Sequence, residues 1–84
     1  MNERQFKEFD VNERMDIINQ EGSYVGVREY YNYKINLYTI YGFFVEVWYS
    51  PLENKITKIQ VADRQIVDKL YSDRVYISSL IDLN

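Results

Sequence analysis

The segment YGFFVEVWYSP, residues 41–51, constrains the fold of this chain more than any other segment. Seven of its eleven residues are aromatic or branched aliphatic, and a single carboxylate, Glu46, lies among them. A strand with one face in water alternates apolar and polar residues more regularly than this. We therefore expect a strand whose second face is also covered, by a helix of the same chain or by another molecule.

The length and composition limit what can stabilise such a strand. The chain has 84 residues, so we expect a single small domain, 1–84, which buries a modest core. It contains no Cys and no His, which rules out disulfides, thiol chemistry and the commonest transition-metal ligand. No cofactor or metal site is predicted. Self-association is then the remaining source of additional stability.

One helix is predicted before the strands in the chain and one after them. Asp10 is a suitable N-cap for a helix over residues 10–22, with Glu13 as its capping-box partner. Gly22 is expected to end this helix in the left-handed conformation. Before it, Phe6 and Phe9 would pin the N-terminal segment to the core, as an extra turn or as an extended lead-in. The apolar stripe of the helix is Val11, Met15 and Ile18.

Residues 24–61 show a strand pattern interrupted by turn signals near residues 31–32, at Gly42 and in PLENK, residues 51–55. A second helix follows, capped by Asp63, with the stripe Ile66, Val67, Leu70 and Tyr71. Residues 75–84 are expected to be extended, with Val75, Ile77 and Leu80 packed. The predicted fold class is α+β: an N-terminal helix, a three- or four-stranded antiparallel β-meander and a C-terminal helix.

The apolar pattern predicts a register for the strands. If odd-numbered residues face the core, three strands contribute a coherent layer, and Val47 lies opposite Ile59. That layer is Ile35, Leu37, Val45, Val47, Ile59 and Val61. The other side, which we call the even face, then collects Tyr38, Ile40, Phe44, Glu46, Trp48, Ile56 and Lys58.

The even face is the candidate interaction site, through Tyr38, Ile40, Phe44, Glu46, Trp48 and Lys58. In this register Trp48 lies opposite Lys58, and Glu46 can form an ion pair with Lys58 while the lysine stem covers the indole. Two arrangements are open. Either one helix covers each face, or both helices cover the odd face and the aromatic even face binds a partner, most concretely a second copy of the chain.

The sequence contains no catalytic pattern, and we predict a non-enzymatic interaction module rather than an enzyme. The Ser residues have no His partner, and the three glycines do not form a phosphate-binding loop. A single-stranded nucleic-acid binder is an alternative, because Arg28, Lys34 and Lys58 are interleaved with aromatic residues. The net charge of −3 argues against it. Another alternative is an acidic inhibitor or immunity-type protein with a basic partner.

The N-terminus is charged and lacks the apolar core of a signal peptide, and no run of 18 apolar residues is present. We therefore expect no membrane association and a cytoplasmic location.

The stretch from Tyr33 to Ile59 resembles the central segment of a family of short bacterial proteins without a known activity. The resemblance rests on YK-x-x-LY, FVEVWY and N-x-I-x-KI, which here begin at Tyr33, Phe44 and Asn54. It extends from about Phe6 to Leu80, with Ser72 at a position where the family pattern has Leu. The resemblance implies that FVEVWY is a strand unit, and it implies no activity, cofactor or partner.

Overall fold

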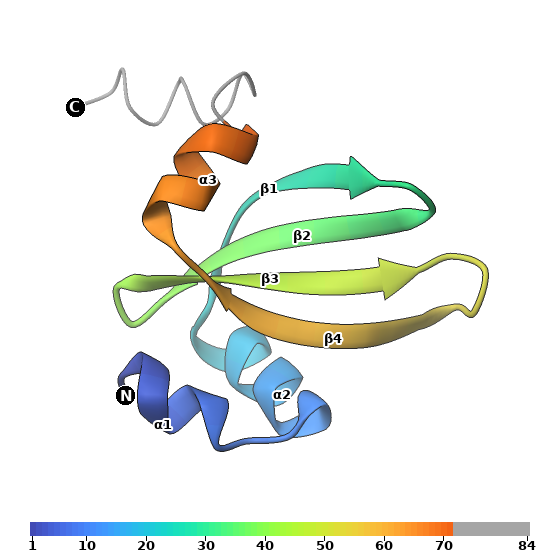
Figure 1. The fold of residues 1–84 in the computed structure, drawn as a ribbon. Helices are drawn as coiled ribbons and strands as arrows, with labels where there is room; N and C mark the ends of the chain where they lie inside the picture. Colours follow the sequence, from blue (N-terminus) through green and yellow to red (C-terminus); the bar gives the residue numbers. More distant parts are fainter. Residues whose placement is uncertain (72–84) are drawn as a thin grey trace.

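The computed structural model describes residues 1–71, and the predicted extended segment with Val75, Ile77 and Leu80 lies outside them. The described chain forms three helices and four strands (Figure 1). In chain order they are α1 (Glu3–Lys7), α2 (Val11–Glu21), β1 (Ser23–Tyr30), β2 (Tyr33–Ile40), β3 (Phe43–Ser50), β4 (Lys55–Ala62) and α3 (Arg64–Tyr71). The predicted α+β class is confirmed, with four strands. No helix within residues 1–71 has the length and apolarity to cross a membrane.

The helix starts are fixed by local side-chain hydrogen bonds. Asp10 accepts a hydrogen bond from the backbone N–H of Glu13 at 2.8 Å, and the Glu13 carboxylate accepts one from the N–H of Asp10 at 3.0 Å. This confirms the predicted capping box of α2. Asp63 accepts a hydrogen bond from the N–H of Gln65 at 2.7 Å and so caps α3, as predicted. The segment before Asp10 is the short helix α1, whose Phe6 is completely buried.

Gly22 ends α2 for a different reason than the one predicted. Its backbone is extended, with φ −84° and ψ 156°, so the expected left-handed conformation is wrong. A Cβ at this position would lie 2.7 Å from the carbonyl oxygen of Ile18. The helix end therefore requires glycine because the backbone of the preceding turn is too close for a side chain.

The strands form one antiparallel sheet in the order β1-β2-β3-β4. The β2–β3 connection has only two residues, Tyr41 and Gly42, and both have positive φ, of 51° and 86°. Two-residue hairpins favour this geometry because its twist matches that of the strands. Tyr31 and Asn54 have positive φ in the other two turns, in line with the turns predicted there.

The predicted register is right for β3 and for Lys58–Val61 of β4, but wrong for β2 and for Ile56. A bulge after Trp48 pairs Ile56 with Tyr49, so Ile56 leaves the predicted even face and packs with the cluster around Val47 and Ile59. Val47 lies opposite Ile59 and Trp48 lies opposite Lys58, as expected. In β2, however, Leu37 lies opposite Glu46, so the odd residues of β2 share a face with the even residues of β3. The two-residue turn causes this change, because a hairpin closed between residues 40 and 43 pairs odd with even positions.

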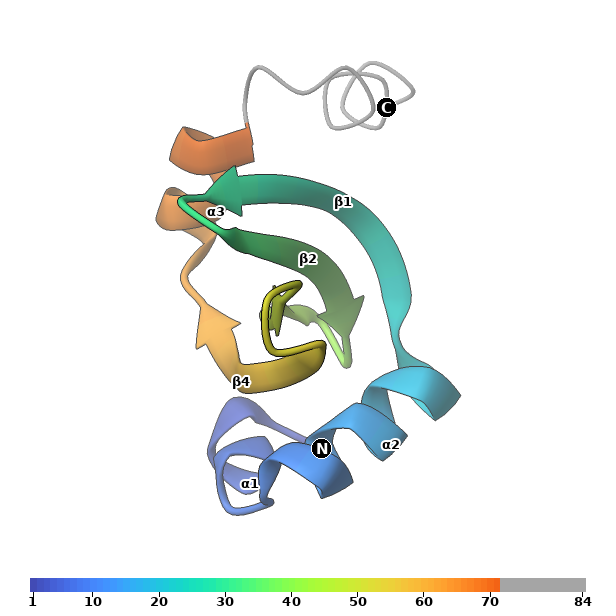
Figure 2. The ribbon, with the colours of Figure 1, turned by 90° about the vertical axis from the view of Figure 1, so that its right-hand side faces the viewer.

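Helices cover both faces of the sheet, which gives three layers (Figures 1 and 2). α1 and α2 pack on one face around a cluster that includes Phe6, Ile18, Val45, Val47 and Ile59. We call this side the α2 face. α3 packs on the opposite side, the α3 face, where the buried residues of its cluster are Leu37, Ala62, Val67 and Tyr71. Of the two arrangements left open by the sequence, the structure has the one with a helix on each face.

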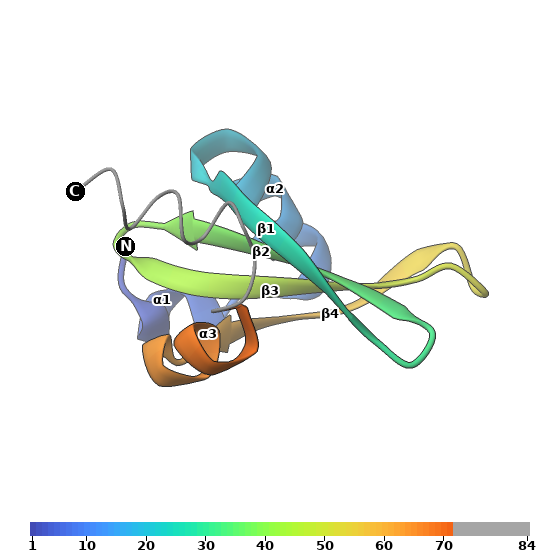
Figure 3. The same ribbon diagram turned by 90° about the horizontal axis from the view of Figure 1, so that it is seen from above.

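α3 covers only part of its face. It lies at the end of the sheet where β4 ends, whereas the β1–β2 and β3–β4 turns project away from it at the other end (Figure 3). The α3 face near these turns therefore depends on its own side chains for cover.

Arg14 joins α2 to α1 and to the edge strand β4. Its Nη1 donates a hydrogen bond to the carbonyl oxygen of Ile59 at 2.6 Å, and its Nη2 donates one to that of Lys7 at 2.7 Å. The guanidinium also lies over the ring of Phe6, 5.6 Å from its centroid. One side chain thus satisfies an outward-facing carbonyl of β4 and the last carbonyl of α1.

Candidate functional site

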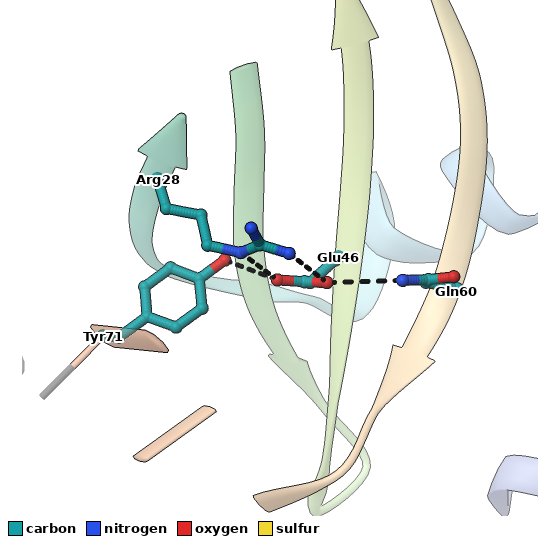
Figure 4. A network of polar contacts seen from close by, with 4 residues as sticks. All are labelled: Arg28, Glu46, Gln60 and Tyr71. Carbon is teal, nitrogen blue, oxygen red and sulfur yellow. Dashed lines mark hydrogen bonds and ion pairs between the residues drawn. The ribbon is translucent and has the colours of Figure 1, made fainter. Parts of the chain in front are cut away.

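The α3 face contains a buried polar network centred on Glu46, which is only 2% exposed (Figure 4). Arg28 of β1 donates through Nε to Oε2 at 2.9 Å and through Nη2 to Oε1 at 3.4 Å. The hydroxyl of Tyr71, from α3, donates to Oε2 at 2.7 Å. Gln60 of β4 donates weakly to Oε1 at 3.5 Å. One carboxylate therefore ties together β1, β3, β4 and α3.

The network shifts the pKa values of its members. Burial works to raise the pKa of Glu46, but the hydrogen bonds from Arg28 and Tyr71, the charge of Arg28 and the bond from Gln60 together lower it below its ordinary value. Burial, followed by the bond to Glu46, raises the pKa of the Tyr71 hydroxyl well above its ordinary value. Glu46 is thus an anion and Tyr71 a neutral donor at neutral pH.

This arrangement holds the layers together. Both oxygens of Glu46 already accept hydrogen bonds, and Tyr71 is completely buried. An ionic hydrogen bond of this kind is shorter and stronger than a neutral one. The carboxylate therefore acts as the docking point for α3.

The predicted ion pair between Glu46 and Lys58 is wrong. Lys58 lies on the indole of Trp48 instead, with Nζ 4.0 Å from the ring centroid, so the predicted cover of the indole by Lys58 is confirmed. Arg28 takes the place of Lys58 as the partner of Glu46, and its guanidinium also lies 5.5 Å from the Trp48 centroid. Arg28 reaches Glu46 from two strands away because both lie on the α3 face.

A second feature of the α3 face is a group of four aromatic side chains, which we call the aromatic cluster: Tyr30, Tyr31, Tyr33 and Trp48. Tyr33 and Tyr30 meet Trp48 edge to face, with centroid distances of 5.4 and 5.8 Å. Tyr31 meets Tyr30 in the same manner at 4.6 Å. These geometries are the favourable ones for aromatic pairs. The cluster extends from the buried indole to the tip of the β1–β2 hairpin.

The cluster combines exposed and buried members. Tyr31 is 86% exposed and Tyr30 49%, whereas Trp48 is 9% exposed. The indole Nε1 of Trp48 is shielded from solvent and finds no hydrogen-bond acceptor among residues 1–71. A buried donor without an acceptor costs free energy, so this nitrogen would gain from any acceptor that reached it.

The six predicted interaction residues do not form one face. Tyr38 and Ile40 lie on the α2 face, where Ile40 is buried and Tyr38 packs against the α2-face core. Phe44, Glu46, Trp48 and Lys58 share the α3 face, as predicted. Of these four, Lys58 is exposed, Phe44 is half-buried beside the Leu37 cluster, and Glu46 and Trp48 are buried.

Sequence reasoning missed the residues that complete both features. The sequence pattern places Tyr71 in an apolar stripe and indicates only turn or strand positions for Tyr30, Tyr31 and Tyr33. The signal that places Tyr33 beside Trp48 was available, because the two-residue turn at Tyr41–Gly42 fixes which side chains of β2 and β3 share a face. Nothing comparable in the sequence indicates that the Tyr71 hydroxyl reaches Glu46.

Within residues 1–71, no group of three or more acidic side chains converges in a way that could hold a metal ion. No family model, curated protein or solved structure matches the chain in comparisons with known proteins.

Proposed function

We propose that this protein is a non-enzymatic interaction module that binds another protein through the aromatic cluster. The main support for the proposal is that exposed rings pack on a buried one. Tyr31 and Tyr30 are exposed, Tyr31 contacts Tyr30, and Tyr30 packs on the buried Trp48. Large exposed aromatic side chains at one end of a small domain are typical of protein-binding surfaces.

The cluster has properties that favour binding. Tyrosine and tryptophan offer a large contact area with few rotatable bonds, and they dominate the binding energy of many interfaces. The edge-to-face contacts with Trp48 restrict the rings before a partner arrives, which lowers the entropy lost on binding.

The distribution of charge favours a protein over a single-stranded nucleic acid. Of the three cations suggested for phosphate binding, Arg28 is paired with Glu46, and Lys34 lies on the α2 face with its neighbour Tyr49. Lys58 alone remains beside the aromatic cluster as a cation that forms no ion pair with any of residues 1–71. Nucleic-acid affinity depends on several phosphate contacts, and one lysine supplies few of them.

An acidic inhibitor would use a different surface. Residues 1–22 carry six carboxylates, Glu3, Glu8, Asp10, Glu13, Asp16 and Glu21, against three cations, Arg4, Lys7 and Arg14. The net charge of this segment is thus 3 − 6 = −3, equal to that of the whole chain. A basic partner would therefore approach the α1–α2 layer, and the exposed tyrosines would have no part in it.

The chain offers a matched pair of variants to test the proposal. Tyr31 and Tyr41 are both exposed turn residues at positive φ, 52° and 51°, and they lie at opposite ends of the sheet. Asn tolerates this backbone conformation, so Tyr31→Asn and Tyr41→Asn remove one ring each with little backbone strain. Short peptides are selected from a displayed random library on the wild-type protein and then titrated against both variants.

We expect the selected peptides to bind Tyr31→Asn about tenfold more weakly than the wild type, because an aromatic residue of the interface is lost. They should bind Tyr41→Asn like the wild type. Equal loss in both variants, or no selected peptide that depends on Tyr31, would refute binding through the cluster. A parallel titration with a single-stranded oligonucleotide covers the alternative: a Tyr31-dependent, salt-sensitive complex would favour the nucleic-acid function.

Homodimerisation through the α3 face, where Trp48 lies, stays a prediction. α3 covers part of that side, and Tyr38 and Ile40 lie on the other, so a dimer would have to use the aromatic cluster. Light scattering over a range of concentrations measures the solution mass. A monomeric mass at the highest concentration would exclude the dimer.

A further inference from the structure

The area of the aromatic cluster limits the size of its partner. An aromatic side chain buries about 150–250 Å², so Tyr31 at 86% and Tyr30 at 49% exposure together offer roughly 300 Å². A stable interface between folded proteins takes about 800 Å² from each partner. The cluster alone therefore suits a short segment of chain better than a second folded domain or a second copy of this protein.

The hydrogen-bonding character of the cluster limits the chemistry of that segment. The indole Nε1 of Trp48 is a donor only, and it has no acceptor among residues 1–71. A proline residue contributes a backbone carbonyl and no N–H, so a proline-containing segment presents acceptors without competing donors. Such segments adopt the extended polyproline II helix in advance, which leaves their carbonyls free and lowers the entropy lost on binding.

Lys58 is the side chain on the indole that is free to move, and its charge sets a preference for the partner. Because Trp48 Nε1 is shielded, a carbonyl reaches it only when a neighbouring side chain moves. Lys58 is exposed, lies directly on the indole and forms no ion pair with any residue from 1 to 71, so it can move without breaking one. Once displaced, its ammonium is free to pair with a carboxylate.

We propose that the aromatic cluster binds an extended, proline-containing segment of another protein that carries a carboxylate near the prolines. Prolines pack on Tyr30 and Tyr31, a peptide carbonyl accepts a hydrogen bond from Trp48 Nε1, and the carboxylate pairs with the displaced Lys58. This inference rests on the proposed function and specifies its partner.

Trp48 supplies the direct readout, because it is the only tryptophan in the chain and its indole N–H gives a single NMR signal. The probe is an oligoproline peptide with a glutamate at each end. Two peptides serve as controls: the same oligoproline with a lysine at each end, and a Gly/Ser peptide of equal length with the glutamates kept. The expected result is a downfield shift of the indole proton that saturates with the first peptide, with a dissociation constant on the order of 100 μM, since the contact area is small.

Three variants separate the contributions. Tyr31→Asn should weaken binding of the glutamate-ended oligoproline about tenfold, and Tyr41→Asn should not change it. Lys58→Met keeps most of the stem over the indole and removes the charge. It should bind the glutamate-ended and lysine-ended peptides equally, whereas the wild type should prefer the former by about two- to fivefold, the range of an exposed ion pair.

The inference is overturned if neither oligoproline moves the indole signal, or if the Gly/Ser peptide moves it equally. It is also overturned if the signal shifts with protein concentration alone while the mass doubles, because the occupant is then a second copy. In each of these cases the proposed function survives if the displayed library yields a Tyr31-dependent peptide of another composition. It falls as well if no such peptide is found.

Discussion

Replacing Glu46 with Gln should destabilise the fold severely although the two side chains have nearly the same shape. The substitution removes the negative charge and puts an amide N–H₂ where Arg28 or Tyr71 now finds an acceptor. The Arg28 side chain, 12% exposed, is then left with its charge nearly buried and without a counter-ion. Breaking one side of a buried ion pair costs about 3–5 kcal/mol.

We expect the lower end of this range, about 3 kcal/mol, because Arg28 retains some contact with water and can partly rehydrate. A domain of this size loses about 4–8 °C of melting temperature per kcal/mol. The melting temperature of Glu46→Gln should therefore fall by about 12–24 °C. Thermal unfolding followed by circular dichroism measures it, with urea unfolding as a second determination of the free energy.

Glu53→Gln is the matched control. Glu53 also pairs with a cation, Lys55 at 3.6 Å, but both side chains are more than half exposed. Its loss should change the stability by less than about 1 kcal/mol, since surface ion pairs contribute little. If the melting temperature of Glu46→Gln falls by no more than that of Glu53→Gln, less than about 8 °C, the carboxylate does not hold the layers together.

A triple variant tests whether the charge itself is needed. Arg28→Met, Glu46→Leu and Tyr71→Phe together replace the buried members of the network by apolar side chains. Only Gln60 loses a partner, and it is exposed and can hydrogen-bond to water instead. Fully apolar replacements of buried ion pairs are often neutral or stabilising. We therefore expect the triple variant to recover most of the stability that Glu46→Gln alone loses.

Four further effects should follow from the same structure. Because the pKa of Glu46 is lowered, its contribution is present above its ordinary value of 4.5 and should be lost as pH falls through the folded-state pKa; urea midpoints between neutral and acidic pH measure this. Because the pKa of Tyr71 is raised, its contribution is present below 10.0 and should be lost as pH rises past that value, and Tyr71→Phe should abolish this alkaline decline. Gly22→Ala should cost about 1–3 kcal/mol by calorimetry, since its Cβ would collide with a helix carbonyl; an unchanged melting temperature would show that the helix end can shift. Asp10→Ala should cost about 1 kcal/mol through loss of the cap, and a melt identical to that of the wild type would contradict the capping role.

The parts of the fold that depend on neighbouring residues could be predicted from the sequence. The capping box at Asp10 and Glu13 and the cap at Asp63 involve residues at most three positions apart. The turns at Gly42 and Asn54 follow from the backbone freedom of those two residues. The alternation along β4 gave the pairing of Val47 with Ile59, because Ile59 and Val61 lie on one face of β4 and match the spacing of Val47 and Val45 in β3.

The register of β2 failed because apolar residues occupy both of its faces. Ile35 and Leu37 are completely buried on the α3 face, and Ile40 is buried on the α2 face. Such a strand fits either register by hydrophobicity, so the turn length decides, and the two-residue turn reverses the odd–even assignment. The interaction face inherited this error at Tyr38 and Ile40.

The partner of Glu46 could not be predicted, because it depends on how long side chains cross the sheet. Pairing by adjacent strands pointed to Lys58. The adjacent strand β4 supplies only the weak bond from Gln60. The two stronger partners come from β1, two strands away, and from α3, whose position over the sheet is a tertiary property.

The hydrogen bond from Arg14 to the Ile59 carbonyl has a consequence for growth of the sheet beyond one molecule. Fibrils that extend a sheet indefinitely need an available edge on each side of every copy, one to receive a strand and one to offer to the next. In this protein an incoming strand at β4 would first have to displace a guanidinium that also anchors α1. Strand addition at β4 is then opposed, and the protein lacks one of the two available edges that an indefinitely growing sheet requires.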